Sequence, residues 1–162
     1  MITVPGADRG RVNIAGLLCY RPAQRSRLIY RLHVYHRRRH EQKTFTEADY
    51  IALLDDAHQQ LGAPIVLIWD NLNRHTDAQI QPYLHRRDWL TVIQLPPYTP
   101  DLNPVEGLWS ALKRGLGNRL TDHVDHLAAT IKSRLSTMQH RNDSLLDGFL
   151  AATGLTLDPI TP

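Results

Sequence analysis

The chain is poor in the residues that several common kinds of site require. Its 162 residues include a single cysteine, Cys19, which can form neither an internal disulfide nor a cluster of thiolate ligands. No apolar run approaches the ~18 residues needed to cross a bilayer, and residues 1–6 lack the basic start and the apolar stretch of a secretory signal. These absences predict a soluble, cytoplasmic protein.

Motifs of several enzyme classes are missing as well. The sequence has no glycine-rich phosphate loop, which argues against nucleotide hydrolysis, and no serine at a nucleophile elbow. Histidines stand close together at His36 and His40 and at His123 and His126, but no Cys-x-x-Cys or His-Glu-x-x-His spacing accompanies them. We interpret these histidines as surface residues rather than zinc ligands.

Basic residues gather in one stretch, although the formal net charge is only +3. Between residues 21 and 43 the only acid is Glu41, and the basic residues are Arg21, Arg25, Arg27, Arg31, Arg37, Arg38, Arg39 and Lys43. Such a cluster can neutralise phosphates, because the planar guanidinium donates two hydrogen bonds at once. A charge run alone is more often a solvated surface. The cluster therefore permits a nucleic-acid partner without requiring one.

The first half of the chain alternates in a way that predicts strands and one helix. Residues 11–20 and 28–36 are two β-rich runs joined by a polar turn, which predicts an antiparallel hairpin with one apolar face. Thr46 and Gly62 suit the start and the end of a helix. The uninterrupted apolar run 64–69 is typical of a strand that is buried on both faces in the middle of a parallel sheet.

The second half predicts further alternation of helices and strands. We expect a polar helix over 74–87, a strand over 89–95, and a rigid proline-rich loop over 96–104. Asn103 and Pro104 then begin a helix that ends at Gly117, and a last helix runs over 121–138. This order predicts one mixed α/β domain over residues 1–140, followed by a loosely structured tail over 141–162.

Two acids occupy positions that suit chemistry. Asp70 directly follows the apolar run, where a carboxylate is costly to desolvate unless a cation or a donor offsets it. Glu106 lies in the first turn of the helix after the proline-rich loop. Simpler explanations exist, since Asp70 and Asn71 can turn the chain and Asn103-x-x-Glu106 resembles a capping box. Capping leaves the stiff loop unexplained, and rigid loops that aim one side chain are typical of sites.

Two longer motifs carry a resemblance to a known family. The runs VLIWDNLNRH over 66–75 and LPPYTPDLNPVEGLWSALK over 95–113 resemble the two signature blocks of the IS630/Tc1-mariner DDE transposases. The separation of Asp70 and Glu106, 106 − 70 = 36 positions, matches that superfamily. The resemblance extends back through residues 11–16 and 47–50 and covers most of the chain up to about residue 135.

The resemblance implies an RNase H-like fold, in which an antiparallel hairpin is followed by parallel strands and helices flank the sheet. It also implies phosphoryl transfer on DNA ends with two Mg²⁺ or Mn²⁺ ions ~4 Å apart. Asp70 would be shared between the metals and Glu106 would bind one of them. Asn71, His75 and Asn103 would support the site or contact DNA. Asp101 is a backup acid in the loop, although a role as a turn residue or a cap explains it better. DNA backbone contacts are expected from Arg37, Arg38, Arg39, Lys43, Lys113 and Arg114.

The beginning of the chain departs from the family pattern. These enzymes carry a first catalytic Asp at the end of a first strand, upstream of the run that resembles residues 11–20. The first ten residues hold only one acid, Asp8, and the pattern shows no apolar strand before it. The sequence therefore predicts that the first Asp, most of the first strand and the helix-turn-helix region are missing. The chain would be a decayed remnant, a mis-assigned start, or the second part of a protein whose first part is encoded in another frame.

A site without one of its three acids should bind metal weakly, so we expect the isolated chain neither to cut nor to join DNA. Two other functions stay open. A non-catalytic DNA-binding module would bind in a salt-sensitive way that survives Asp70→Asn and Glu106→Gln. An oligomerising fragment would instead associate with itself or with another transposase fragment, and would complement or inhibit a full-length transposase.

Overall fold

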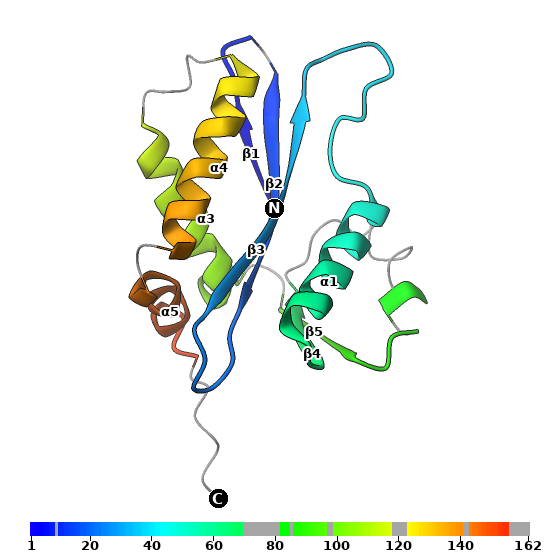
Figure 1. The fold of residues 1–162 in the computed structure, drawn as a ribbon, viewed down its shortest axis with the longest axis vertical. Helices are drawn as coiled ribbons and strands as arrows, with labels where there is room; N and C mark the ends of the chain where they lie inside the picture. Colours follow the sequence, from blue (N-terminus) through cyan, green and yellow to red (C-terminus); the bar gives the residue numbers. More distant parts are fainter. Residues whose placement is uncertain are drawn as a thin grey trace, which may run out of the picture. The chain divides into compact units, whose positions relative to one another are not determined.

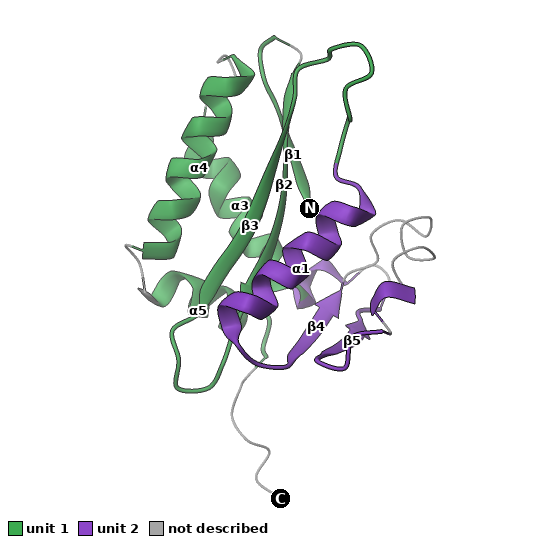
Figure 2. Cartoon of the chain, turned by 45° about the vertical axis from the view of Figure 1, so that its right-hand side comes forward, with its two compact units in different colours: residues 1–44, 103–162 green, residues 45–102 purple. Residues whose placement is uncertain are grey.

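The computed structural model describes the chain apart from residues 9, 70–81, 85, 97–98, 118–122, 141–142 and 156–162. The chain forms two compact units (Figure 2). Unit 1 combines residues 1–44 with residues 103–162, and unit 2 is the continuous stretch 45–102. Within the described ranges, no helix has the length and apolar character to span a membrane.

Unit 1 contains an antiparallel sheet in the order β1, β2, β3. The strands are β1 Ile2–Pro5, β2 Arg11–Cys19 and β3 Arg27–Tyr35. The hairpin expected over 11–20 and 28–36 is confirmed, with Val12 opposite Val34 and Gly16 opposite Tyr30. The apolar face expected for the second strand packs against the core through Leu28, Tyr30, Leu32 and Val34.

Three helices of unit 1 cover one face of this sheet: α3 Pro104–Leu116, α4 Val124–His140 and α5 Asp143–Ala152 (Figure 1). Their apolar stripes follow helical spacing and fill the core against β2 and β3. Each fully buried Leu or Ile contributes roughly 1.5–3 kcal/mol. The largest fully buried side chains on α3 and α4 are Trp109, Leu108, Leu112, Leu127, Ile131 and Leu135.

Unit 2 contains α1 Glu47–Leu61, β4 Ile65–Trp69, β5 Leu90–Gln94 and the short 3-10 helix η1 Pro100–Leu102. The two strands pair in parallel, with Ile65 opposite Leu90. The predicted helix boundaries are confirmed, because Thr46 and Asp49 form a capping box and Gly62 ends α1 in the left-handed region at φ 59°. The His58 ring of α1 stacks on Trp89, the residue before β5, with ring centroids 4.0 Å apart.

The strand β1 corrects the expectation that no apolar strand precedes Asp8. Ile2 and Val4 are buried and pair with Ile14 and Val12 of β2, whereas Thr3 and Pro5 point outward. Two inward side chains give too short an alternation to stand out in the sequence. Pro5 lies at the end of an edge strand, where its missing N–H costs no ladder bond.

The strand β4 is only partly as predicted. It forms at the expected residues, but among the described residues it pairs with β5 alone. Its outer face is open, since Val66 is 62% exposed and Ile68 is 48% exposed. The expectation of a strand buried on both faces is therefore wrong for the described part of the chain. Each strand of a two-stranded sheet is paired along one edge only.

The C-terminal region also differs from expectation. Residues 143–152, for which the sequence predicts a loose tail, form α5, and Leu146 on this helix is buried. The hydroxyl of Tyr20 donates to the carbonyl of Leu146 at 2.9 Å, which ties the end of β2 to α5. The helix expected over 74–87 lies mostly outside the described residues, although 82–84 are helical and Leu84 is buried. The domain boundary at residue 140 stays a prediction.

Candidate functional site

Glu106 lies in the first turn of α3, where the local chemistry fixes the helix start. Asn103 is the N-cap, and its side-chain oxygen accepts from the Val105 amide at 3.1 Å, while Pro104 occupies the first helical position. The Glu106 amide donates to the Asn103 carbonyl at 3.0 Å. The positive end of the helix dipole favours a carboxylate in this turn. Glu106 is partly exposed, and no ion pair joins it to another described residue.

The neighbour of Glu106 fixes how this turn packs within unit 1. A Cβ atom on Gly107 would lie 2.7 Å from Cδ1 of Phe149 on α5. The absence of a side chain at residue 107 thus lets the Phe149 ring lie directly against the α3 backbone. The first turn of α3 is held by its cap on one side and by α5 on the other.

The other acid of the predicted pair falls outside the described residues. Asp70 follows the last residue of β4 in the chain, and Asn71 and His75 belong to the same stretch. Among the described residues, no group of three or more His, Cys, Asp or Glu side chains could hold a metal ion. The pairing of Asp70 with Glu106 stays a prediction.

Part of the proline-rich loop is described and is ordered by short contacts. The Thr99 hydroxyl donates to the Pro96 carbonyl at 2.7 Å, and the Leu102 amide donates to the Thr99 carbonyl at 3.1 Å. Asp101 lies in η1 and is exposed. These contacts agree with a stiff loop leading to the N-cap at Asn103.

The basic residues assigned to DNA are on the surface. Arg37, Arg38, Arg39 and Lys43 are exposed in the loop after β3, and Lys113 and Arg114 are exposed in the last turn of α3. The structure gives each of them the solvent access that a phosphate contact needs. Their role stays a prediction.

Sequence reasoning missed a set of alternating acids and histidines in unit 1. The His36 ring contacts Glu41 at 3.0 Å and Asp125 at 2.8 Å, and Asp125 lies 3.6 Å from His123. The hydrogen bonds to Asp125 and to Glu41 raise the pKa of His36. The His36 amide, with further help from the Arg38 amide, lowers the pKa of Glu41 to about 2 despite some desolvation. The histidines expected to be solvated are therefore partly engaged by acids.

Asp8 has a structural use in this unit. Its carboxylate accepts from the Gly10 amide at 3.1 Å and from the Val124 amide at 3.4 Å, and it lies 3.3 Å from His123. Desolvation raises the pKa of Asp8, but the bonds from Val124 and Gly10 outweigh it and the pKa is lowered. Asp8 satisfies a free amide at the start of α4 and lies in the turn between β1 and β2.

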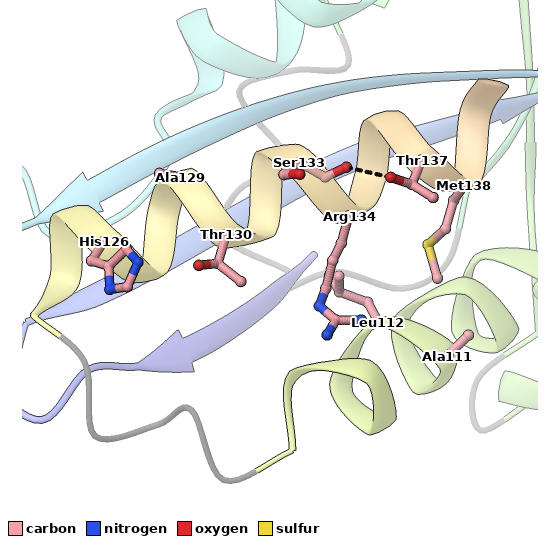
Figure 3. A pocket seen from close by; sticks show the side chains of 9 residues that line it. All are labelled: Ala111, Leu112, His126, Ala129, Thr130, Ser133, Arg134, Thr137 and Met138. Carbon is pink, nitrogen blue, oxygen red and sulfur yellow. Dashed lines mark hydrogen bonds between the residues drawn. The ribbon is translucent and has the colours of Figure 1, made fainter. Parts of the chain in front are cut away.

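A groove of about 570 Å³ lies between α3 and α4 (Figure 3). Leu112 contributes from α3, and His126, Arg134 and Met138 contribute from α4. None of the described residues that line this groove carries a carboxylate, so it does not offer the acidic oxygens that a hard divalent cation prefers. The groove is therefore distinct in chemistry from the site predicted at Asp70 and Glu106.

Comparison with known families decides the relationship. A family model described as DDE superfamily endonuclease matches residues 5–128. The chain belongs to the DDE superfamily endonucleases. This DDE match includes both signature blocks of the sequence, and the resemblance to the IS630/Tc1-mariner transposases is confirmed as that of a DDE transposase domain.

Individual proteins similar to this DDE chain include two named transposases. The Tc1 transposase of Caenorhabditis elegans is 35% identical over 69 residues, which are 43% of this chain and 25% of that protein. The Tcb1 transposase of Caenorhabditis briggsae is 35% identical over 60 residues, 37% of this chain and 22% of that protein. The uncharacterised protein y4pE/y4sA of Sinorhizobium fredii is 37% identical over 67 residues, 41% of this chain and 47% of that protein. The matched stretches thus span less than half of each relative.

Proposed function

We propose that residues 1–140 are part of an RNase H-like transposase catalytic domain of the IS630 type, which acts in the cytoplasm on the DNA ends of an insertion element. The observation that carries the proposal is the match of the DDE endonuclease family over residues 5–128. The reaction class is metal-dependent cleavage and transfer of DNA strands. Glu106, at a helix start fixed by Asn103 and Phe149, supports this assignment.

The residues expected in the site fit a hard divalent cation. Asp70 and Glu106 supply carboxylate oxygens, the ligands that Mg²⁺ and Mn²⁺ prefer. Two bound ions supply activation of a water or a 3′-hydroxyl and stabilisation of the leaving oxygen. The chain's own part is to hold Glu106 in a fixed first turn and to set Asp70 directly after β4. We assign Asn71, His75 and Asn103 to support of these acids or to DNA contact.

We also propose that the chain works with an upstream transposase fragment or as a homo-oligomer, and that residues 1–162 are inactive alone because Asp70 and Glu106 supply only two of the three acids of a DDE site. Support comes from the outer face of β4 and β5 in unit 2. Val66, Ile68 and Ile93 are 62%, 48% and 51% exposed there, and β4 pairs with β5 alone among the described residues. A strand with an open edge and apolar side chains is suited to pair with a further strand.

The metal site is tested by titrating Mn²⁺ into the 162-residue chain and following the free ion by electron paramagnetic resonance. Loss of a group that only supports a metal ligand weakens metal binding roughly 10–100-fold. Because Asp70 and Glu106 are proposed as ligands themselves, we expect Asp70→Asn and Glu106→Gln each to weaken Mn²⁺ binding by at least that factor. Asp88→Asn removes an exposed acid outside the proposed site and is the matched control. Equal Mn²⁺ affinities in the unaltered chain and its three variants would contradict the assignment of Asp70 and Glu106 as metal ligands.

Inactivity of the isolated chain is tested with DNA that carries the ends of its own element. We expect no cleavage in Mg²⁺ or Mn²⁺ by the chain alone. Cleavage should appear when an upstream fragment that supplies the first Asp is added, and Glu106→Gln should abolish it. Robust cleavage by the chain alone would contradict the proposal that a further fragment must supply the third acid.

A second function, non-catalytic DNA binding, is favoured by the exposed arginines after β3. It predicts that binding to duplex DNA falls steeply with salt and is unchanged by Asp70→Asn and Glu106→Gln. The same metal titration separates the two functions, because a binding module has no use for the two acids.

A further inference from the structure

We propose that Glu41 is the positioning residue of a DNA-phosphate-binding loop formed by residues 36–43, called here the arginine loop. The inference deepens the proposed function and rests on its assignment of Arg37, Arg38 and Arg39 to the DNA backbone. It assigns a role to the one acid in a basic stretch, a residue that simple electrostatics would count as unfavourable for binding DNA.

The arginine loop takes a backbone path that needs support. Arg37 and His40 both lie in the left-handed region, at φ 63° and φ 64°. This region costs a residue with a side chain roughly 1–2 kcal/mol, because its Cβ crowds the following carbonyl. Two such residues within one short loop persist only when surrounding contacts hold the backbone.

The Glu41 side chain supplies those contacts from inside the loop. One carboxylate oxygen accepts from the His36 amide and from the Arg38 amide, each at 2.9 Å. The other accepts from the His36 amide at 3.0 Å and contacts the His36 ring at the same distance. The Glu41 amide in turn donates to the Arg38 carbonyl at 3.2 Å. The carboxylate is therefore turned inward and its charge is taken up by backbone amides.

The ends of the arginine loop are anchored to the sheet and to α4. At its base, Asn13 and Arg11 of β2 donate to the Lys43 carbonyl at 3.1 and 3.0 Å. Asn13 is only 1% exposed, and its oxygen also accepts from the Thr3 hydroxyl of β1. At its start, the His36 ring contacts Asp125 near the beginning of α4. All of these partners belong to unit 1.

The exposed residues 37–39 of the arginine loop are all cationic. Arg37, Arg38 and Arg39 are exposed, and no described acid pairs with their side chains. Three adjacent guanidinium groups on a fixed backbone match the repeating phosphates of a nucleic-acid strand. We commit to duplex DNA as the partner because the proposed site acts on DNA ends.

The test measures binding of the full chain to a short DNA duplex by fluorescence anisotropy at several salt concentrations. Electrostatics alone predicts that Glu41→Ala binds more tightly, because an acid leaves the basic surface. The positioning role predicts the opposite. We expect the slope of log K against log salt to fall by about 1–2, and affinity at 0.1 M salt to fall roughly 5–10-fold for each phosphate that the loop no longer binds.

Three comparisons make the result decisive. Asp88→Asn removes an exposed acid outside the arginine loop and should leave binding unchanged or slightly tighter. Glu41→Gln keeps one acceptor oxygen and should recover part of the affinity, which also covers the case that Glu41→Ala fails to fold. In Glu41→Ala, hydrogen exchange should show reduced protection at the His36 and Arg38 amides and unchanged protection in β2.

The outcomes separate this inference from the function on which it rests. If Glu41→Ala and Glu41→Gln bind as tightly as Asp88→Asn, the positioning role of Glu41 is overturned. If a triple replacement of Arg37, Arg38 and Arg39 by alanine leaves the affinity and the salt slope unchanged, the DNA contact itself is overturned. Tighter binding to an RNA duplex or to an acidic peptide of equal charge would overturn duplex DNA as the partner.

Discussion

A Cβ atom on Gly16 would lie 2.9 Å from Cη2 of Trp109, so the indole of α3 rests directly on the backbone of β2. Trp109 is 1% exposed and is the largest fully buried side chain of the core. We expect Gly16→Ala to lower the free energy of unfolding by roughly 1–3 kcal/mol, because the added methyl group overpacks this contact. Urea unfolding followed by circular dichroism measures the change.

The control for that variant is Gly148→Ala. Gly148 lies inside α5, and nothing lies within 4 Å of the position its Cβ would take. Alanine there should be neutral or stabilise by up to about 1 kcal/mol, since glycine is the poorer helix former. Equal losses at Gly16 and Gly148 would contradict the packing explanation.

Gly107→Ala should destabilise the first turn of α3. The added methyl group would meet the Phe149 ring at 2.7 Å, and a ring cannot yield as the end of a long flexible side chain can. We expect a loss of roughly 1–3 kcal/mol, measured by thermal unfolding. In the double variant Gly107→Ala/Phe149→Leu, the total loss of stability should be smaller than the sum of the two single-variant losses. Strict additivity would show that the two positions do not contact.

The ion pair of unit 2 should depend on the shape of the guanidinium. Arg87 donates to Asp55 through Nε at 3.0 Å and through Nη2 at 2.9 Å. Lysine cannot reproduce this two-pronged contact, so Arg87→Lys should cost about 0.5–1 kcal/mol at low salt and less at 1 M salt. Arg86→Lys at an exposed position is the control. Tryptophan fluorescence during urea unfolding provides the readout, and identical effects of the two variants would refute the prediction.

Stability of the arginine loop should depend on pH through His36 and Glu41. The raised pKa of His36, due first to Asp125 and then to Glu41, gives a contribution that is complete below pH 6.5 and is lost as pH rises through the raised value. The lowered pKa of Glu41 gives a contribution that is complete above pH 4.5 and is lost as pH falls towards about 2. The loop should therefore be most stable between about pH 4.5 and 6.5.

Nuclear magnetic resonance of the His36 ring protons measures this directly. We expect a midpoint above 6.5 that shifts downward in Asp125→Asn, the variant that removes its nearest carboxylate. His123 and Asp8 adjoin Asp125 and belong to the same set of charges, so His123→Gln is a useful comparison. A His36 midpoint at or below 6.5 would contradict the contacts described.

Local signals in the sequence were enough to predict most helices. Thr46 with Asp49, and Asn103 with Pro104, mark helix starts because a cap is made by residues that are close together in the chain. The hairpin of β2 and β3 was predicted for the same reason. The strand β1 was missed because only Ile2 and Val4 point inward. Long-range packing, not local pattern, decides whether so short a stretch becomes a strand.

The candidate site was predictable only in part, because its geometry depends on distant partners. The signature blocks pointed to Glu106, and the helix start that holds it is as expected. Nothing near Glu41 in the sequence indicates that its carboxylate is turned inward. His36 and Asp125 are 89 positions apart, and no periodicity connects them. Packing of α5 against Gly107 was likewise invisible, because a glycine carries no side-chain pattern.

The division of unit 1 into residues 1–44 and 103–162 has a consequence for how the chain folds during synthesis. The first three strands leave the ribosome well before α3, yet Trp109 and Leu112 provide the surface that buries them. Unit 2 is continuous and has all of its residues available earlier. The apolar face of the newly made sheet therefore stays uncovered until residues 103–162 have been synthesised. This interval is when a nascent chain is most exposed to chaperones and to aggregation.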